Sequence, residues 1–373
     1  MIYLDYAANT PVDQEVINRF VEVTNQFIAN PNSSHLLGRE AKEELNRTTE
    51  HIAELLGVKP SEIIYTSGAS EANNLAIKGI AQAYRQNGKH IISTCLEHPS
   101  VSGALTYLQS LGYEIDLVDI MSDGRVDLEN LKELLRKDTV LVSICSVDSE
   151  LGVRQPIEEI GRILEAYPNC YFHTDATQAI GKIDAAANLA DCFTFTPHKF
   201  FGMNGCGILV KKEKVILTPL IHGGTSTTIY RSGTPAIGLS ASIEKALELS
   251  ALHLKERYQA VSELNSYLRQ QLLKYKKVRL NSSEFSVPHI LNLSVQGIKA
   301  GVFQEALEKE GICVSIKSAC SVVGAPSRPV YAVSKDKKNA MCSWRISISH
   351  LTTRKELEAF LEAFDRCYQR LDG

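Results

Sequence analysis

The sequence predicts an α/β fold, with a large domain built on a mainly parallel central sheet flanked by helices and a smaller α+β unit toward the C-terminus. Between about residues 60 and 211, short apolar and β-branched runs alternate with segments of helical periodicity. That alternation is typical of a parallel sheet covered on both faces. From residue 241 the pattern changes to a long, almost continuous helical stretch. A chain of 373 residues suits two domains.

The large domain should contain strands that alternate with helices. The expected strands are IIYT (63–66), HIIST (90–94), YEIDLVDI (113–120), TVLVSICSV (139–147), CYFHTDA (170–176), DCFTFT (191–196) and GCGILVK (205–211). The expected helices follow the glycine and hydroxyl residues of 67–70 and lie near 100–112, 128–137 and 157–167.

The small domain should follow the helical stretch 241–277. Its expected strands lie near 289–295 and 344–349, and its expected helices near 301–311 and 354–364. We therefore expect a large domain over 15–250, and a small domain made of 1–14 together with 251–373.

Composition excludes several classes of protein. Lys plus Arg total 40 and Asp plus Glu total 43, which gives a net charge of −3, so no direct nucleic-acid binding is expected. No run approaches the ~18 consecutive apolar residues of a membrane span. The nine cysteines include no Cys-x-x-Cys pair, so we expect no metal site, and unpaired thiols in a reducing, cytoplasmic setting.

Two segments carry residues suited to chemistry on a carbonyl cofactor. Lys199 in TPHKFFG could form a Schiff base with an aldehyde, or could be a surface lysine in a loop. Asp175 in HTDATQ ends an apolar strand, where parallel sheets place ligand-binding residues. It could pair with a pyridinium nitrogen of pyridoxal phosphate (PLP) or simply cap a helix.

Three further segments are weaker when taken singly. The TSGASEANN turn, with Ser70, offers backbone N–H groups for an anion at a helix start, but it has neither a Walker A nor a GxGxxG pattern. His98 in LEHPSV could stack on a ring or relay protons, or be structural. Cys320 lies among small and polar residues, as in an exposed loop, and is a candidate nucleophile.

Taken together and in order, these motifs resemble those of the cysteine desulfurases of the NifS/IscS type. The resemblance runs through YLDYAANTPVD, NPNSSH, TSGASEANN, LEHPSV, SELG, HTDATQAIGK, TPHKFFG, HGG, RSGT, SAC and WRISIS. It covers essentially the whole chain. It implies a PLP-dependent transferase of fold type I, related to the class V aminotransferases.

The resemblance also implies a role for each matching residue. Lys199 would hold PLP as a Schiff base, and Cys320 would receive the sulfur atom of L-cysteine as a persulfide and pass it on, leaving L-alanine. The other cofactor-binding residues would be Asp175 at the pyridine nitrogen, Gln178 at the phenolic oxygen, His98 over the ring, and Ala69, Ser70, Thr196 and His198 at the phosphate.

Further implied residues concern the substrate and the second subunit. Thr234 in RSGT would reach the phosphate of the neighbouring subunit, which makes the enzyme a homodimer with shared sites. Arg345 would bind the substrate carboxylate, and Asn30 and His35 would line the substrate entrance. The sulfur acceptor would be a protein such as an iron–sulfur scaffold or a tRNA-thiolation enzyme.

The sequence departs from the family pattern at several places. Ser149 stands where the family usually has asparagine near the phenolic oxygen, and Lys317 stands where it usually has the glycine before SAC. Lys317 could lower the pKa of the thiol or dock an acidic acceptor. The alternatives are a selenocysteine lyase or another PLP-dependent β-lyase; a non-catalytic scaffold fits poorly because the reactive residues are present. The missing GxGxxG also disfavours a nicotinamide dehydrogenase.

Overall fold

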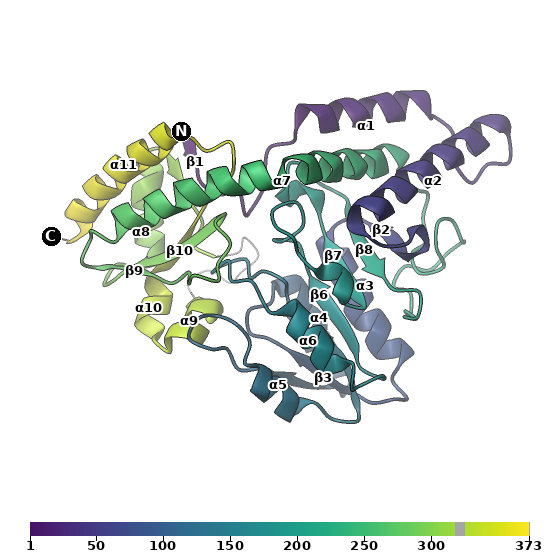
Figure 1. The fold of residues 1–373 in the computed structure, drawn as a ribbon, viewed down its shortest axis with the longest axis horizontal. Coiled ribbons are helices and arrows are strands. Elements are labelled where there is room, and N and C mark those ends of the chain that lie inside the picture. The colour runs from purple at the N-terminus through teal and green to yellow at the C-terminus, as the bar shows by residue number, and fades with distance from the viewer. Residues whose placement is uncertain (318–324, 373) are drawn as a thin grey trace.

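A seven-stranded sheet forms the centre of the computed structural model, which describes residues 1–317 and 325–372 (Figure 1). The strand order is β2-β8-β7-β6-β5-β3-β4. The strands are β2 (Ile63–Thr66), β3 (His90–Ser93), β4 (Glu114–Leu117), β5 (Thr139–Ser143), β6 (Tyr171–Asp175), β7 (Cys192–Phe195) and β8 (Gly207–Lys211). Strand β8 runs antiparallel to both of its neighbours, β2 and β7, and the other pairings in this sheet are parallel. The predicted mainly parallel sheet is confirmed.

Helices cover both faces of this sheet because neighbouring strand residues point to opposite sides. Ile91 and Leu141 pack with α3 (Ala69–Ala83) and α4 (Pro99–Ser110) on one face. Ile92 and Val142 pack with α5 (Leu128–Leu134) and α6 (Ile157–Leu164) on the other. Short 3₁₀ turns lie at Pro60–Glu62, Ala187–Leu189 and Pro197–Lys199.

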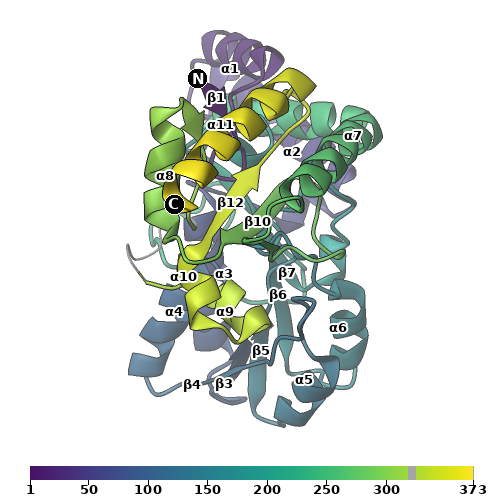
Figure 2. The same ribbon diagram turned by 90° about the vertical axis from the view of Figure 1, so that its left-hand side faces the viewer.

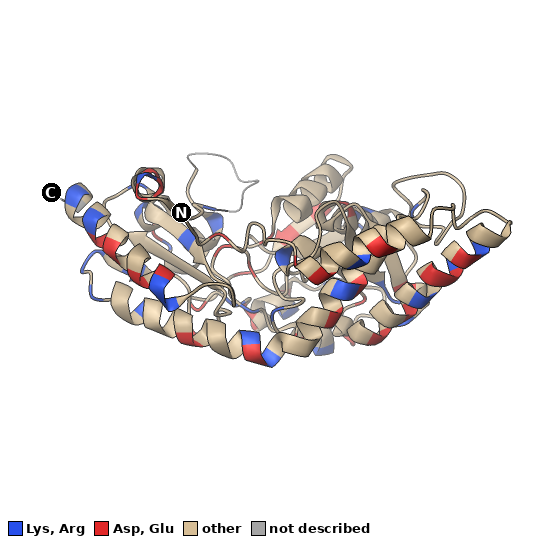
Figure 3. Cartoon of the chain, turned by 90° about the horizontal axis from the view of Figure 1, so that it is seen from above, with Lys and Arg blue, Asp and Glu red and all other residues tan. Residues whose placement is uncertain are grey.

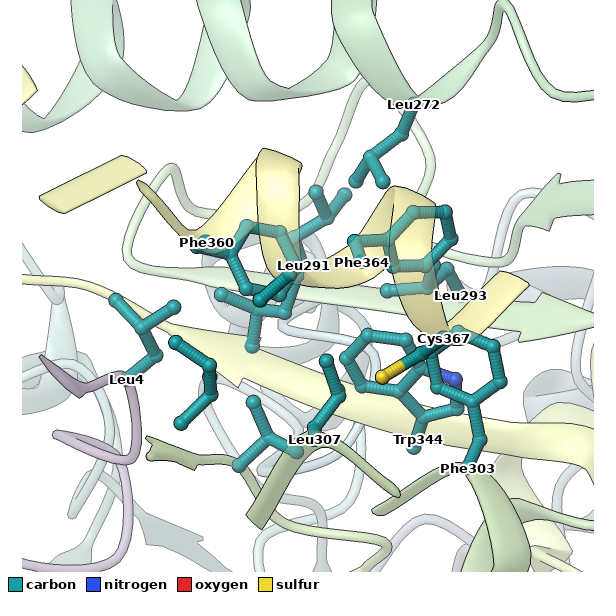
Figure 4. Packing of buried hydrophobic residues seen from close by; sticks show 14 of the residues in the cluster. Leu4, Leu272, Leu291, Leu293, Phe303, Leu307, Trp344, Phe360, Phe364 and Cys367 are labelled. Atoms are coloured by element: carbon teal, nitrogen blue, oxygen red, sulfur yellow. The ribbon is translucent and has the colours of Figure 1, made fainter. Parts of the chain in front are cut away.

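The C-terminal part forms a smaller α+β unit around an antiparallel sheet ordered β12-β10-β9 (Figure 2). Its strands are β9 (Val278–Leu280), β10 (Ile290–Val295) and β12 (Ser343–Ser347), and its helices are α8 (Ala300–Lys309), α9 (Arg328–Ser334), α10 (Lys337–Cys342) and α11 (Arg354–Asp372). Figure 4 shows its core, where Trp344 stacks on Phe303 with ring centroids 5.4 Å apart.

The N-terminus returns to this C-terminal unit. Strand β1 (Ile2–Tyr3) pairs in parallel with β11 (Ile312–Cys313), and Leu4 joins the core of the smaller unit. A few residues later, Ala7 already packs in a core cluster with the central sheet. The chain therefore crosses from one core to the other within the segment that holds the motif DYAA.

Helix α7 (Ile237–Leu272) links the two cores (Figure 1). Its first half packs against the central sheet through residues such as Leu247, and its second half packs in the smaller core through Leu268. Because both cores share this helix, the boundary near residue 250 stays a prediction. The amphipathic helices α1 (Gln14–Gln26) and α2 (Leu36–Leu56), which were not predicted from the sequence, pack against α7.

Charges of both signs are interspersed along the helices (Figure 3), in line with the net charge of −3. Across the residues the structure describes, none of the helices has the length and apolarity needed to cross a bilayer.

Candidate active site

A cavity of about 390 Å³ lies at the carboxyl ends of β5, β6 and β7, beside the N-termini of α3 and α4. This is the edge where open parallel sheets bind ligands. Ten residues predicted from the sequence line it: Ala69, Ser70, His98, Ser149, Asp175, Gln178, Thr196, His198, Lys199 and Arg345.

The N-terminus of α3 forms one end of the cavity. Gly68 precedes the helix with a φ of 152°, which a residue with a side chain rarely adopts, and no side chain caps the helix there. A Cβ on Gly207 would lie 2.7 Å from the Gly68 backbone, so only glycine allows β8 to approach this closely. The backbone N–H groups of the first turn, at Ala69 and Ser70, are of the kind that can bind an anion, and their predicted role at a phosphate stays a prediction.

His198 and Thr196 share a hydrogen bond beside this helix end. The Thr196 hydroxyl donates to the Cys206 carbonyl at 2.8 Å, so its oxygen accepts from His198 Nδ1 at 2.9 Å. Burial, together with the charges of Lys199 and Lys182, lowers the pKa of His198 to about 4. A phosphate group at the helix end would oppose this shift, because an anion stabilises the imidazolium form.

Lys199 ends the 3₁₀ turn that follows β7. Its Nζ donates to the carbonyl oxygens of Ala7 at 3.0 Å and Ala8 at 2.6 Å. The DYAA segment therefore holds the amine through two backbone carbonyl groups. In the sequence this segment stood out only as a family motif, and its carbonyl groups had no predicted role.

Asp175 is held from two sides at the end of β6. Asn73 Nδ2 donates to its Oδ2 at 2.8 Å, and the Thr177 backbone N–H donates to its Oδ1 at 3.0 Å. Asn73 is fully buried and also contacts Ser100 and Thr194. No role was predicted for Asn73 from the sequence, although a polar residue on the buried face of a helix is a signal that could have identified it.

His98 is the N-cap of α4, and its Nδ1 accepts from the Ser100 backbone N–H at 3.2 Å. Burial lowers the pKa of His98, and the charge of Lys199 lowers it further while Asp175 opposes the shift. The lowered pKa favours the neutral imidazole, and this hydrogen bond then assigns its proton to Nε2.

Arg345 in β12 is 1 % exposed and is oriented by two contacts. Its Nη2 donates to Asp5 Oδ1 at 2.8 Å, and its Nη1 donates to the Ser149 carbonyl at 2.7 Å. The Nε atom is buried without a partner. The guanidinium group thus has N–H donors left for a carboxylate. Ser149 contacts Arg345 through its backbone carbonyl and not through its hydroxyl group.

Three predicted residues lie outside the cavity of their own chain. Thr234, Asn30 and His35 are all exposed. His35 caps α2, and Asn30 Oδ1 accepts from the Asn32 backbone N–H. Their predicted roles in substrate and cofactor binding stay predictions.

The predicted nucleophile Cys320 lies outside the described residues. The described residues on either side of 318–324 are in contact. Lys317 Nζ donates a hydrogen bond to the Ala325 carbonyl oxygen, with the two atoms 2.5 Å apart. The suggested effect of Lys317 on the thiol or on an acceptor stays a prediction.

The other eight cysteines are all unpaired thiols, six of them buried. Burial raises the pKa of the partly exposed Cys95, raises that of Cys206 to about 12, and raises that of Cys145 in the cavity wall well above its ordinary value. Such thiols react poorly because the thiolate is the nucleophile. Cys313 is partly exposed but belongs to β11, away from the cavity lining.

The donor set of the cavity fits pyridoxal phosphate. A primary amine suits the aldehyde, the anchored Asp175 suits the pyridine nitrogen, and the helix N-terminus suits the phosphate. Thr177 Oγ1 also lines the cavity region as a buried atom without a partner.

Comparison with known proteins identifies the family to which the chain belongs. The profile of the family described as "Aminotransferase class-V" matches residues 2–360. A protein named "Cysteine desulfurase IscS" from Dictyoglomus turgidum is 35% identical over 99% of this chain and 95% of its own length. The chain belongs to the cysteine desulfurases of this family. The resemblance and the activity inferred from the sequence are confirmed.

Solved structures agree with this assignment. A NifS-like protein superposes on this desulfurase with a TM-score of 0.92 and 32% identity, covering 99% of both chains. A structure described as "SspA in complex with cysteine" superposes with a TM-score of 0.82 and 29% identity, covering 95% of the desulfurase and 100% of that protein. Membership of the class-V aminotransferases implies a PLP-dependent enzyme.

Proposed function

We propose that this desulfurase binds pyridoxal 5′-phosphate in the 390 Å³ cavity through Lys199 and transfers the sulfur atom of L-cysteine to Cys320, releasing L-alanine. The observation that carries the proposal is that Lys199, Asp175 and the N-terminus of α3 line one cavity. L-Cysteine as substrate is supported by the similarity to SspA, whose structure is described as a complex with cysteine.

The cofactor, when bound, supplies an electron sink for the carbon atoms of the substrate. The proposed holding residues are Asp175 at the ring nitrogen, Gln178 at the phenolic oxygen, His98 over the ring, and Ala69, Ser70, Thr196 and His198 at the phosphate. Ser149 is placed near the phenolic oxygen only by the family pattern. Thr234 is proposed for the phosphate of the second subunit.

The remaining steps fall to the chain's own side chains. Arg345, which lines the cavity and is already oriented by Asp5, binds the substrate carboxylate through its guanidinium N–H groups. The neutral imidazole of His98 has one protonated and one unprotonated ring nitrogen, so it can give up one proton and accept another, which suits proton relay. The Cys320 thiolate forms a sulfur–sulfur bond as the carbon–sulfur bond of cysteine breaks, and the persulfide then passes to an acceptor.

A homodimer with shared sites is supported by the position of the RSGT segment. Arg231 pairs with Glu71 at the start of α3, with Nε and Oε1 2.9 Å apart, whereas Thr234 is exposed on its own chain. Asn30 and His35 are exposed in a segment that contacts the same loop through Asn32 and Ser226. We propose that all three complete the neighbouring subunit's cavity. Mixing Lys199→Ala with Thr234→Ala subunits should then restore one competent site per heterodimer.

The unpaired thiols support a reducing, cytoplasmic location. The acceptor is proposed to be a protein, such as an iron–sulfur scaffold or a tRNA-thiolation enzyme. A domain division at 1–14, 15–250 and 251–373 is supported by the separate cores on either side of α7.

Borohydride reduction and peptide mapping test the cofactor assignment. The adduct should lie on Lys199, and an adduct on another lysine would contradict the proposal. Release of alanine from cysteine compared with selenocysteine separates the desulfurase from a selenocysteine lyase.

The test of the nucleophile uses a matched pair of variants. Cys320→Ser should retain the absorbance of the bound cofactor but accumulate no labelled persulfide. Cys313→Ser, which removes another partly exposed thiol, should accumulate it at the wild-type rate. Persulfide formation in Cys320→Ser at the wild-type rate would show that another cysteine carries the sulfur.

A further inference from the structure

Lys182 is a buried lysine beside the candidate active site, with no role predicted from the sequence. It is 9 % exposed and follows the turn after β6. Among the described residues, no carboxylate lies within ion-pair distance of it. Its Nζ instead donates to Gln178 Oε1 at 2.7 Å. Burying a lysine in this way is costly, so its contact with Gln178 calls for an explanation.

This contact determines which end of the Gln178 amide is available to the cavity. A lysine ammonium can only donate, so it binds the amide oxygen and leaves the nitrogen to point elsewhere. Gln178 Nε2 donates to the Ala7 carbonyl at 3.0 Å, and the same oxygen accepts from Lys199 Nζ at 3.0 Å. A continuous hydrogen-bonded chain therefore joins Lys182 to Lys199 through Gln178 and the Ala7 carbonyl.

We propose that Lys182 is a positioning residue that fixes the Gln178 amide with its NH₂ group, rather than its oxygen, toward the phenolic oxygen of the cofactor. The inference rests on the proposed function, in which Gln178 contacts the phenolic oxygen of the cofactor. Without Lys182, only the contact of the amide NH₂ group with the Ala7 carbonyl opposes rotation, and a turned amide presents its oxygen, which repels a phenolate. Lys182 thus acts on the cofactor through Gln178.

The charge of Lys182 is also sensitive to its surroundings. Burial, with smaller effects from Lys199 and Arg345, lowers the pKa of Lys182 to about 7. Its other titratable neighbours are His198 and His289, whose pKa values its charge lowers. Both the charged and the neutral amine carry N–H donors, so the contact with Gln178 persists through this titration.

A second set of groups lines the small cavity that Lys182 and Lys199 share. It has a volume of about 20 Å³, enough for one water molecule. Its charged or titratable residues, besides the two lysines and His289, are Tyr6, Arg257 and His350. These groups also affect the pH titration of the bound cofactor. Because they are the same in every variant, comparing matched variants cancels their contribution.

The pH titration of the cofactor's absorbance band is the readout, because a merely structural lysine would not move it. In Lys182→Met the midpoint should rise, since a positive charge and a donor near the phenolic oxygen both favour the deprotonated imine. Retention of pyridoxal phosphate should fall about tenfold, as expected for one hydrogen bond to a charged group. Lys211→Met is the matched control: Lys211 is buried, also donates to a carbonyl oxygen, and lies outside the cavity lining.

A double-mutant comparison decides whether Lys182 acts through Gln178. In a Gln178→Leu background, Lys182→Met should shift the midpoint clearly less than it does in the wild-type background, because only the direct effect of the charge remains. An equal shift in both backgrounds, or no shift in Lys182→Met, would overturn the inference. If Lys182→Met does not fold, Lys182→Gln takes its place and should preserve retention, because it keeps a neutral donor. Absence of the cofactor from Lys199 in the wild type would instead refute the proposed function.

Discussion

Replacing Asn73 with alanine should destabilise the protein more than the same change at its neighbour, Asn74. Asn73 is fully buried in α3 and joins Asp175, Ser100 and Thr194 by hydrogen bonds of 2.8, 2.9 and 2.5 Å. Alanine leaves a carboxylate and two hydroxyl groups without this partner inside the protein. The cost of an unsatisfied buried group then adds to the loss of the bonds.

The magnitude follows from the three contacts. The bond to Asp175 is worth about 1.5–3 kcal/mol and each neutral bond about 1 kcal/mol, and alanine returns roughly 0.5 kcal/mol through its helix propensity. Since the three bonds share one side chain, we expect ~3 kcal/mol rather than their full sum. With an unfolding entropy of about 2.1 cal/mol/K per residue, the 373-residue chain should lose about 4 °C in thermal midpoint.

Asn74 provides the control because it undergoes the same chemical change on the same helix. It is partly exposed, and its Nδ2 donates only to the carbonyls of Ser70 at 2.9 Å and Ser100 at 3.3 Å. Asn74→Ala should shift the midpoint by less than half as much. The assay is thermal denaturation of both variants without added cofactor, followed by retention of pyridoxal phosphate on gel filtration. Equal midpoints in the two variants would refute the view that Asn73 anchors Asp175.

Three other perturbations test separate parts of the site. Burial lowers the pKa of His289 to about 3, so the folded state binds fewer protons than the unfolded state from pH ~6.5 downward, and stability falls as the pH decreases through that range. His289→Gln should therefore lose less thermal midpoint than the wild type between pH 7 and 5, and an equal loss would rule His289 out. Glu71→Gln breaks the partly buried pair with Arg231 and should weaken cofactor retention about fivefold, the equivalent of ~1 kcal/mol; unchanged retention would separate that pair from the phosphate site. Asp5→Asn leaves the buried guanidinium of Arg345 without its carboxylate and should lower the midpoint, and L-alanine should raise the midpoint more in the variant than in the wild type if Arg345 binds the substrate carboxylate.

Local patterns were enough to predict most of the large domain. The run CYFHTDA is buried at most positions and includes the strand-favouring residues Tyr171, Phe172 and Thr174, and it forms β6 with Asp175 at its end. The helix over α3 follows its glycine and hydroxyl start as expected. Short amphipathic helices such as α1 were missed because their apolar faces pack on α7, a partner far along the chain. The strands β1 and β11 are two residues each, too short for any periodicity.

The sequence by itself determined the family and predicted the reactive groups, because chemistry on a carbonyl cofactor restricts residue types and the motifs occur in a fixed order. Only the tertiary structure decided what holds those groups in place. The Ala7 carbonyl receives both Lys199 and Gln178, and Arg345 is oriented by Asp5 from the opposite end of the chain. These contacts join segments separated by 171 residues or more in the sequence, and no local propensity encodes them. Burial likewise sets the charge of Lys182, because desolvation depends on every element packed around the amine and not on its neighbours in the sequence.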